Sequence, residues 1–325
     1  MIDPSTPRAL AIVGPTAAGK SALALELAYR FDLPILCCDS VQVFRGLDIG
    51  SAKPSHEDQI ARPHFGLDLV DPDQDFSAGH YAGYARALLE REGPAIVCGG
   101  TGLYLRATGW SHSGDDRPSS DGPRKDDHGV ERERFEQMWF DREAADAGAV
   151  HRALVEIDPV TAGQIHARNV VRAVRALWLC EREGEPISEL RRREPPRTLV
   201  DLMLVVIDPG VEPVDRAIAA RCDAMLAAGW IAEVEKLCAA GYDARHKSMR
   251  SLGYREILEH LAGAKSLDAT RDAITHATRQ YARRQRTYFR HQFRNLLPPE
   301  QIVHIEASHA CPQAKIAAFL ERRSA

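Results

Sequence analysis

Short apolar runs alternate with amphipathic segments along much of the chain. Residues 9–13, 33–38, 95–98 and 202–207 are apolar runs, and each is followed directly by Gly or Asp. Runs of this length suit buried strands. Residues 21–29, between the first two runs, combine helical spacing with strong helix formers. Strands that alternate with helices predict an α/β fold with a parallel sheet.

The pattern changes after the third run. Residues 111–130 are rich in Ser, Gly, Asp and Pro, which is typical of an exposed or disordered loop. Residues 131–185 show helical spacing, and so does nearly everything from Val214 to the C-terminus. We therefore expect three parts. They are a core of residues 1–110 and 200–297 with a helical C-terminal region, a helical insertion at residues 111–199, and a tail at residues 298–325 with no recognisable chemistry.

The most specific local signal is a phosphate-binding loop. Residues 14–21 read Gly-Pro-Thr-Ala-Ala-Gly-Lys-Ser, which fits the pattern G-x-x-x-x-G-K-[ST] between a predicted strand and a predicted helix. Glycines let successive backbone N–H groups curl around an anion, and the helix N-terminus adds a partial positive charge. Lys20 supplies a cation, and the Ser21 hydroxyl can bind Mg²⁺. The loop predicts a polyphosphate site in a P-loop NTPase-like parallel sheet; a glycine turn with a chance lysine is the simpler alternative.

Two further polar clusters follow predicted strands, at residues 39–54 and 99–102. Ligands bind at the carboxyl ends of parallel strands, so both clusters should converge with the phosphate loop on one cleft. Asp39 has three interpretations: a general base, a helix cap, or the magnesium-binding carboxylate of a kinase or ATPase. Asp208, which also follows a strand, could fill the last role. Thr101 could hydrogen-bond a phosphate or a base, beside glycines that allow a ligand to come close.

The C-terminal region contains a strongly basic segment, because residues 279–294 hold six arginines and no Asp or Glu. At helical spacing one face carries most of this charge. It comprises Arg283, Arg286, Arg290 and Arg294, interleaved with Tyr281, Tyr288 and Phe293. Arginines neutralise phosphates and aromatic rings stack on exposed bases, so the segment suggests RNA; a solvated face with buried aromatics is the plainer alternative. Smaller basic patches lie at residues 168–177 and at residues 250–255, where Tyr254 could also stack.

Composition sets the broad class of the protein. The 325 residues are 44% hydrophobic and 27% charged, as in a globular protein, and no apolar stretch reaches the roughly 18 residues that cross a bilayer. The N-terminal apolar run is too short for a secretory signal. Seven cysteines without a CxxC pair argue against a zinc ribbon and a disulfide framework. The net charge of −4 does not itself suggest nucleic acid, so the case for RNA depends on the distribution of charge. We expect a cytoplasmic monomer that does not bind membranes.

The clusters, taken in order, resemble the tRNA dimethylallyltransferases, also called tRNA isopentenyltransferases. The matching stretches are GPTAAGKSALALELA (14–28), DSVQVFRGLDIGSAKP (39–54), GGTGLYLRA (99–107), RNVVRAVRAL (168–177), MRSLGYREI (249–257) and RQYARRQRTYFR (279–290). The first stretch is shared with many phosphate-binding proteins. The second and the last two are far more specific, and the ordered set covers nearly the whole chain.

The resemblance implies transfer of a dimethylallyl group from dimethylallyl diphosphate to N6 of adenine 37, beside the anticodon of a tRNA. The adenine would leave its stack to meet the donor, and Mg²⁺ would be the cofactor. Asp39 would be the general base, and Thr101 would orient the adenine or the diphosphate. The diphosphate would be held by Gly14, Pro15, Thr16, Ala17, Ala18, Gly19, Lys20, Ser21 and Arg221, with Ser21 directed to the metal.

The same resemblance assigns tRNA contacts to several segments. They comprise Asp39, Ser40, Val41, Gln42, Val171, Arg172, Ala173, Val174, Arg175, Arg250, Gly253, Tyr254, Arg255, Arg283, Arg284, Gln285, Arg286 and Arg290. The insertion at residues 111–199 would bind the anticodon arm. The chain departs from many family members at Ala18, at Arg283 and at residues 110–130, which lack a proline-rich pattern. The first two changes remove no required chemistry.

Three other functions fit part of the pattern. An adenylate isopentenyltransferase, which prenylates free adenine nucleotide, shares the first three clusters but has no need of the basic regions after Arg168. A phosphate-loop kinase or ATPase would bind and turn over ATP. A non-enzymatic RNA-binding protein with a decayed site would not need to keep Lys20, Ser21, Asp39 and Thr101.

Overall fold

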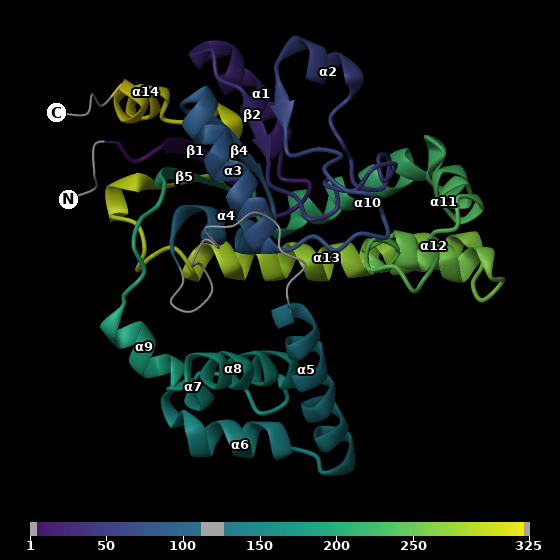
Figure 1. The fold of residues 1–325 in the computed structure, drawn as a ribbon. Helices are drawn as coiled ribbons and strands as arrows, with labels where there is room; N and C mark the ends of the chain where they lie inside the picture. The colour runs from purple at the N-terminus through teal and green to yellow at the C-terminus, as the bar shows by residue number, and fades with distance from the viewer. Residues whose placement is uncertain (1–4, 112–126, 322–325) are drawn as a thin grey trace. The chain divides into compact units, whose positions relative to one another are not determined.

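The computed structural model describes residues 5–111 and 127–321 (Figure 1). The chain divides into two compact units, each with its own hydrophobic core. The first unit comprises Met1–Gly109 and Leu199–Ala325, and the second comprises Trp110–Thr198.

A six-stranded parallel sheet forms the centre of the first unit. Its strands are β1 (Arg8–Val13), β2 (Ile35–Cys37), β3 (His64–Phe65), β4 (Ala95–Gly99), β5 (Asp201–Ile207) and β6 (Ile302–Ile305). The order across the sheet is β3-β2-β4-β1-β5-β6, and every neighbouring pair is parallel. All seven residues of β5 and five of the six in β1 are buried, as expected for central strands covered on both faces. The predicted α/β fold with a parallel sheet is confirmed.

Helices connect and cover the strands of this unit. They are α1 (Lys20–Phe31), α2 (His56–Ala61), α3 (Ala78–Glu92), α4 (Gly102–Gly109), α10 (Val211–Ala227), α11 (Trp230–Ala239), α12 (Tyr254–Leu261), α13 (Leu267–His291) and α14 (Gln313–Glu321), with 3₁₀ turns at Ser248–Arg250, Pro299–Gln301 and Ser308–Ala310. The long helix α13 packs against α10, α12 and α4 (Figure 1). It begins after Ser266, whose hydroxyl accepts the Ala269 N–H, and ends at His291. The predicted basic helix is present, but Arg294 lies beyond its end.

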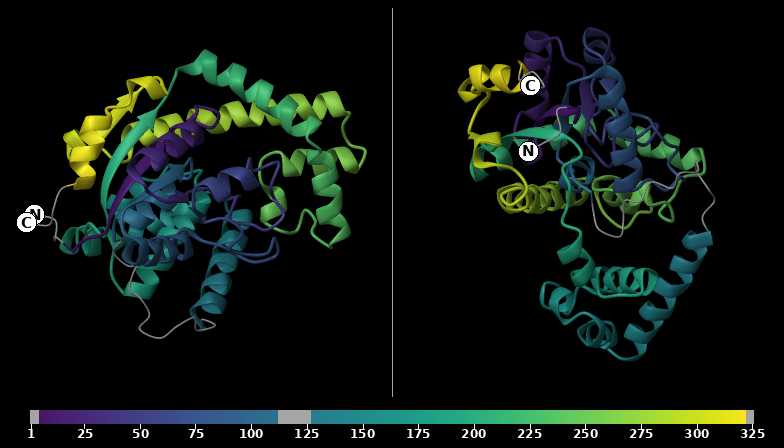
Figure 2. Two further views of the ribbon diagram at one scale, coloured as in Figure 1. Left: turned by 90° about the horizontal axis from the view of Figure 1, so that it is seen from above. Right: turned by 60° about the vertical axis from the view of Figure 1, so that its left-hand side comes forward.

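The C-terminal segment differs from the sequence prediction. The pattern predicts no strand after Val214 and treats residues 298–325 as a tail. In the structure β6 pairs with β5, and α14 packs beside β1 with Ile316 and Phe319 buried (Figure 2). A four-residue strand that includes the exposed His304 is too short to show a clear two-residue period. The two-residue strand β3 was missed for the same reason.

The second unit is helical. Its helices are α5 (Asp127–Ala145), α6 (Ala149–Ile157), α7 (Pro159–Gly163), α8 (Val170–Glu183) and α9 (Ile187–Arg193). Leu154 of α6 packs with Val174 and Leu177 of α8 in the core of the unit. Helices were expected over residues 131–185, and α5 starts slightly earlier, within the predicted loop. The rest of that loop, residues 112–126, lies outside the described residues.

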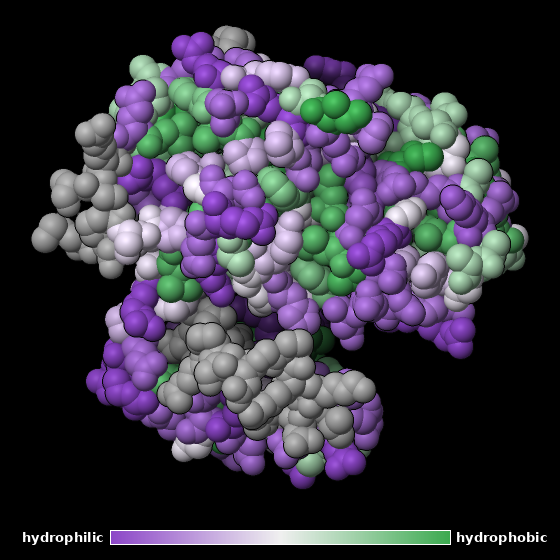
Figure 3. All heavy atoms as spheres, turned by 45° about the horizontal axis from the view of Figure 1, so that its top comes forward, coloured by the Kyte–Doolittle hydropathy of each residue, from purple (hydrophilic) through white to green (hydrophobic). Residues whose placement is uncertain are grey.

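Hydrophobic side chains at the surface are dispersed. On the face shown in Figure 3, hydrophilic residues interrupt the hydrophobic ones. Large apolar side chains that reach solvent come from different elements, for example Ile60 of α2 and Leu103 of α4, which is normal for a protein surface. Across residues 5–111 and 127–321, no helix is both long enough and apolar enough to cross a membrane.

The substitution Ile316→Ala should destabilise the first unit, because Ile316 is fully buried in its core. The lost methyl and methylene groups and the remaining cavity should lower the free energy of unfolding by about 2–4 kcal/mol. Lys315→Ala changes an exposed neighbour and should alter the free energy by less than about 0.5 kcal/mol. Denaturant titration of both variants measures the difference, and equal stabilities would mean that α14 adds nothing to the core.

Candidate active site

The phosphate loop joins β1 to α1 and is curled by residues with positive φ. Gly14, Ala17 and Gly19 have φ values of 146°, 62° and 90°. A Cβ on Gly14 would lie 2.1 Å from the carbonyl oxygen of Ile207, so only glycine fits there. Such a curl turns neighbouring N–H groups toward one point and creates an anion-binding concavity. The structure therefore has the predicted strand–loop–helix arrangement, with α1 starting at Lys20.

The ammonium group of Lys20 lies against this loop. Its Nζ donates a 2.8 Å hydrogen bond to the carbonyl oxygen of Pro15. Burial lowers the pKa of Lys20 to about 8; the charge of Arg221 acts in the same direction, and that of Asp39 opposes it. An anion beside Lys20 would favour its charged form and raise this pKa. The pocket is therefore suited to a negatively charged ligand.

Gln285 of α13 joins two loops of the site. Its Oε1 accepts the N–H of Thr16 at 2.8 Å, and its Nε2 donates to the carbonyl oxygen of Gly100 at 3.0 Å. The Gln285 side chain is buried, and a Cβ on Gly100 would lie 2.0 Å from its Nε2. The resemblance assigns Gln285 to tRNA, yet its amide is engaged inside the protein and not at an exposed surface.

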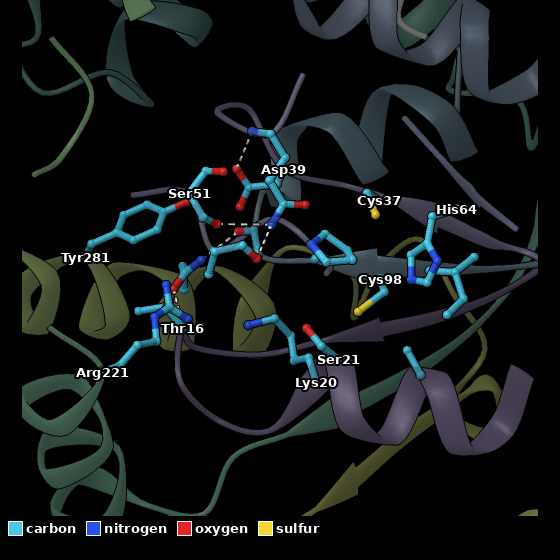
Figure 4. Close-up of a pocket in the computed structure, with 18 residues that line it drawn as sticks. Thr16, Lys20, Ser21, Cys37, Asp39, Ser51, His64, Cys98, Arg221 and Tyr281 are labelled. Atoms are coloured by element: carbon cyan, nitrogen blue, oxygen red, sulfur yellow. Dashed lines mark hydrogen bonds between the residues drawn. The ribbon is translucent and has the colours of Figure 1, made fainter. Parts of the chain in front are cut away.

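Asp39 follows β2 and faces the pocket (Figure 4). Its Oδ1 accepts the N–H groups of Val41 and Gln42, at 2.8 and 3.3 Å. Its Oδ2 has no hydrogen-bond partner among the described residues. Two of the three interpretations of Asp39 are therefore compatible: one carboxylate oxygen caps the turn after β2, and the other is open to a ligand.

Thr101, after β4, supports the turn that carries Asp39. The Thr101 hydroxyl oxygen accepts the Ser40 N–H at 3.0 Å and lies 3.4 Å from the Ser40 hydroxyl oxygen, to which it donates. Gly99, two residues before Thr101, allows the backbone of Cys38 to pack closely, since a Cβ on Gly99 would lie 2.0 Å from the Cys38 carbonyl oxygen. In this structure Thr101 acts on the geometry of the neighbouring loop.

Arg221 of α10 reaches the same pocket (Figure 4). Within the described part of the chain, its guanidinium has no hydrogen-bonded or ion-paired partner. Burial lowers the pKa of Arg221, and the carboxylate of Asp39 opposes that shift. Arg221 is half-buried and faces the pocket, so it is available as a second cation for an anionic ligand.

The remaining lining residues come from segments far apart in the sequence. Ser51, His64, Cys98 and Tyr281 also face the pocket (Figure 4). Burial raises the pKa of the Cys98 thiol to about 11, although Lys20 opposes this shift, so the thiol is neutral. Sequence reasoning gave no role to Ser51, His64 or Cys98, and only Ser51 lies in a stretch that carries the resemblance.

A second pocket adjoins the first. The two share Thr16, Asp39, Ser51, Arg221 and Tyr281. The second continues over side chains that are mostly apolar, and these include Val41, Ile218, Met225, Trp230, Leu252 and Ile274. Asp39 and Arg221 therefore stand where a polar, phosphate-binding space meets a more hydrophobic one.

Asp208, at the end of β5, is neutralised within the protein. Arg286 of α13 donates from Nε to Oδ2 at 2.6 Å and from a terminal nitrogen to Oδ1 at 2.8 Å, and Gly210 donates its N–H at 3.1 Å. Burial raises the pKa of Asp208, but these hydrogen bonds outweigh burial and the net shift is downward. The structure does not support a magnesium-binding role for Asp208, because Arg286 occupies both oxygens. Arg286 itself is directed inward by the same contact.

The residues that the resemblance assigns to tRNA differ in how exposed they are to solvent. The exposed ones are Val171, Arg172, Arg250, Arg255, Arg283, Arg284 and Arg290. The half-buried ones are Asp39, Ser40, Val41, Gln42, Arg175 and Arg286, and the buried ones are Ala173, Val174, Gly253, Tyr254 and Gln285. The buried side chains shape the helices and turns that present the exposed ones.

Tyr254 does not have the stacking role suggested by its sequence neighbours. It is fully buried, its ring packs edge to face on Trp230, and its hydroxyl donates to Glu233 Oε1 at 2.7 Å. A Cβ on Gly253 would lie 2.0 Å from the Trp230 ring. The prediction that Tyr254 could stack on a base is therefore wrong, because its ring is buried against Trp230 of α11.

The described side chains alone do not form a metal cage. Across the residues that the structure describes, no group of three or more His, Cys, Asp or Glu could hold a metal ion. Ser21 lines the pocket in the first turn of α1, beside Lys20. Mg²⁺ usually keeps several waters and takes other ligands from substrate phosphates. The donor set therefore fits a phosphate-bound Mg²⁺ with the Ser21 hydroxyl as a protein ligand.

The sequence of this chain is similar to known prenyltransferases. The family profile described as IPP transferase matches residues 42–292, and one described as isopentenyl transferase matches residues 7–62. The tRNA dimethylallyltransferase of Geobacter metallireducens is 41% identical over 295 residues, which cover 87% of this chain and 89% of that protein. The tRNA dimethylallyltransferase of Pelotomaculum thermopropionicum is 37% identical over 286 residues, which cover 86% and 87%.

Solved structures agree with this assignment. The tRNA isopentenylpyrophosphate transferase of Bacillus halodurans has a TM-score of 0.62 at 29% identity and covers 98% of both chains. A eukaryotic dimethylallyltransferase acting on tRNA shares the fold, with a TM-score of 0.70 at 23% identity over 87% of this chain and 70% of that one. The expected P-loop NTPase-like core is confirmed. Because one profile spans most of the chain and several relatives approach 40% identity, this chain belongs to the IPP transferase family.

Proposed function

We propose that this protein transfers the dimethylallyl group of dimethylallyl diphosphate to N6 of adenine 37 in tRNA. The observation that carries the proposal is a single pocket in which the open oxygen of Asp39 adjoins the phosphate loop, Lys20 and the unpartnered Arg221. A base beside two cations suits a reaction in which one substrate loses a proton and the other loses a diphosphate. The names of the relatives, which are tRNA dimethylallyltransferases, support this choice.

The residues of the pocket match the demands of each bond change. The N6 lone pair forms a bond to C1 of the allylic donor as the C1–O bond breaks, and the electron pair of that bond leaves with the diphosphate. Asp39 Oδ2 accepts the proton that N6 loses. Lys20, Arg221 and the N–H groups of the phosphate loop stabilise the charge that develops on the leaving group.

Mg²⁺ fits this site as a partner of the diphosphate, with the hydroxyl of Ser21 as its protein ligand. When bound, it would neutralise further charge on the leaving group. Thr101 would act by holding the turn of Asp39 through Ser40.

The exposed arginines are proposed to bind tRNA. On α13 these are Arg283, Arg284 and Arg290, which present charge to the phosphate backbone. In the second unit Val171 and Arg172 of α8 are exposed, and we propose that this insertion binds the anticodon arm. A location in the cytoplasm, where tRNA is modified, remains a prediction.

The alternatives are less well supported. The IPP transferase profile continues to residue 292, through the basic helix α13, which a free nucleotide would not require. Of the two carboxylates that could bind Mg²⁺ in a kinase or ATPase, Asp208 is engaged by Arg286, which leaves only Asp39 for that role. The open Asp39 and the unpartnered Arg221 also argue against a decayed, non-enzymatic site.

Transfer of label from dimethylallyl diphosphate to unmodified tRNA, with Mg²⁺, tests the main proposal. Asp39→Asn should reduce kcat by about a hundredfold or more, because the variant has no general base at this position. Asp73→Asn removes the same charge at an exposed site and should leave the rate unchanged. Labelling of free AMP instead of tRNA would establish the nucleotide-prenylating alternative. No labelling of either acceptor would overturn the proposed function.

The affinity for diphosphate should fall as the pH rises through about 8, because Lys20 loses its proton there in the free protein. Below that pH Lys20 is charged and attracts the anion; above it, this attraction is lost. Calorimetric titration between roughly pH 6.5 and 9.5 measures the effect. Lys20→Met should bind more weakly and lose this part of the pH dependence, while any titration of diphosphate itself is common to both proteins. Parallel pH profiles for the two would contradict a role for Lys20.

Arg283→Ala and Arg290→Ala should raise the KM for tRNA and leave the KM for the donor unchanged. Each should reduce the slope of log K against log salt by about 1, as expected for a lost phosphate contact. Arg286→Ala is different: it leaves Asp208 unpaired and should lower the free energy of unfolding by about 1–3 kcal/mol. If the three variants behaved alike in salt-dependent tRNA binding and in denaturation, the distinction between exposed and structural arginines would be wrong.

A further inference from the structure

The carboxylate of Glu233, on α11, accepts hydrogen bonds from a loop that lines the pocket. Its Oε2 accepts the N–H groups of Asp48 at 3.0 Å and Ile49 at 2.6 Å, and its Oε1 accepts that of Gly50 at 3.2 Å. Hydrogen bonds to an ionised acceptor are shorter and stronger than those between neutral groups. Because the three donors are consecutive backbone N–H groups, the carboxylate of Glu233 fixes the path of the loop backbone.

Aromatic rings complete this attachment. The Tyr254 hydroxyl donates to Glu233 Oε1 at 2.7 Å, and its ring packs on Trp230. A Cβ on Gly50 would lie 2.0 Å from Trp230 Nε1 and 2.6 Å from Tyr254 Cζ. The backbone of Gly50 therefore lies in a notch that only glycine fits, and the bonds to Glu233 hold it there.

The attached loop is a wall of both pockets. Ser51 lines the pocket of the phosphate loop and also the more apolar pocket beside it. Gln42 Nε2 donates to the carbonyl oxygens of Ser51 and Ala52, both at 3.1 Å, and the Gln42 N–H donates to Asp39 Oδ1. A displacement of this loop would therefore be transmitted to Asp39 through one residue, Gln42.

We infer that Glu233 is a positioning residue for the transfer reaction. It holds residues 48–51 against the space beside Asp39, where the allylic chain of the donor must lie, and it does not touch the substrate itself. Tyr254 assists by donating a hydrogen bond to the same carboxylate. The inference rests on the proposed function for the identity of the donor, but the attachment of the wall can be measured independently of any activity.

Glu233→Gln is the decisive variant. The amide keeps one acceptor oxygen but places an NH₂ group against backbone N–H groups, so at least part of the attachment is lost. Hydrogen exchange at Asp48, Ile49 and Gly50 should become about tenfold faster or more. The Kd of dimethylallyl diphosphate, measured by calorimetry, and its KM should rise by roughly ten- to a hundredfold, while the KM for tRNA should change little. Tyr254→Phe removes one of the four bonds and should show a smaller effect.

Matched measurements keep the inference falsifiable. Glu235→Gln removes the same charge from an exposed position on α11 and should match the wild type in exchange, in donor Kd and in KM. Glu233→Asp keeps the charge and should recover part of the donor affinity, which a general loss of stability would not explain. Unchanged exchange at residues 48–50, or faster exchange with a donor Kd within about twofold of the wild type, would overturn the inference. Failure of the wild type to label tRNA would count against the proposed function, and the exchange and Kd measurements would still decide the role of Glu233.

Discussion

The side-chain amide of Gln285 lies between the Thr16 N–H and the Gly100 carbonyl oxygen, and the geometry of the site depends on it. These two groups belong to loops that follow β1 and β4, the neighbouring strands at the centre of the sheet. One residue later on α13, Arg286 pairs with Asp208, after β5 on the other side of β1. A single turn of helix thus ties together the loops of three adjacent strands. Because a buried amide or carboxylate without a partner is costly, α13 has little freedom to shift without cost at all three loops.

The same helix presents its other side to solvent. Arg283, Arg284 and Arg290 are exposed, whereas Gln285 is buried and Arg286 is half-buried. Gln285 can point inward beside the exposed Arg284 because immediate neighbours on a helix do not share a face. Arg286 lies three residues from Arg283 and four from Arg290, on the edge of their face, and is only half-buried. A basic surface proposed for RNA is therefore built on the element that holds the phosphate loop. Any adjustment of α13 upon binding a polyanion would be transmitted to Thr16 and Gly100 by two hydrogen bonds. In thermodynamic terms, a coupling of this kind would act equally in both directions between the two ligands.

Local signals in the sequence were enough to predict much of the fold and part of the site. The strands β1, β2, β4 and β5 lie in continuous apolar runs, and the phosphate loop has a fixed spacing of glycine, lysine and serine, so both could be found within short windows. Asp39 was found for the same reason, as a polar residue directly after a strand. Gln285 could not be understood in this way, because it lies 269 residues from Thr16 and 185 from Gly100. Tyr254 was misinterpreted because two neighbouring arginines suggested exposure, while the helix that covers it, α11, lies outside its sequence window. The strand β6 was missed because the exposed His304 interrupts its short apolar run.

The pocket contains a carboxylate and two cations, and these opposite charges suit two different tasks. Asp39 uses Oδ1 for the backbone of its own turn and leaves Oδ2 open, so its position is fixed while one carboxylate oxygen remains free to contact a ligand. Arg221 and Lys20 are both held in surroundings that disfavour their charged forms, and burial is the largest cause in each case. In the proposed reaction, an entering diphosphate would relieve this penalty at both cations, and charge that builds up as the allylic C–O bond breaks would relieve it further. Stabilisation that grows with the charge of the leaving group favours the transition state over the bound donor, which is the condition for accelerating the chemical step. Neutral Cys98 beside Lys20 adds no competing anion, so the positive field of the two cations would remain available to the proposed diphosphate.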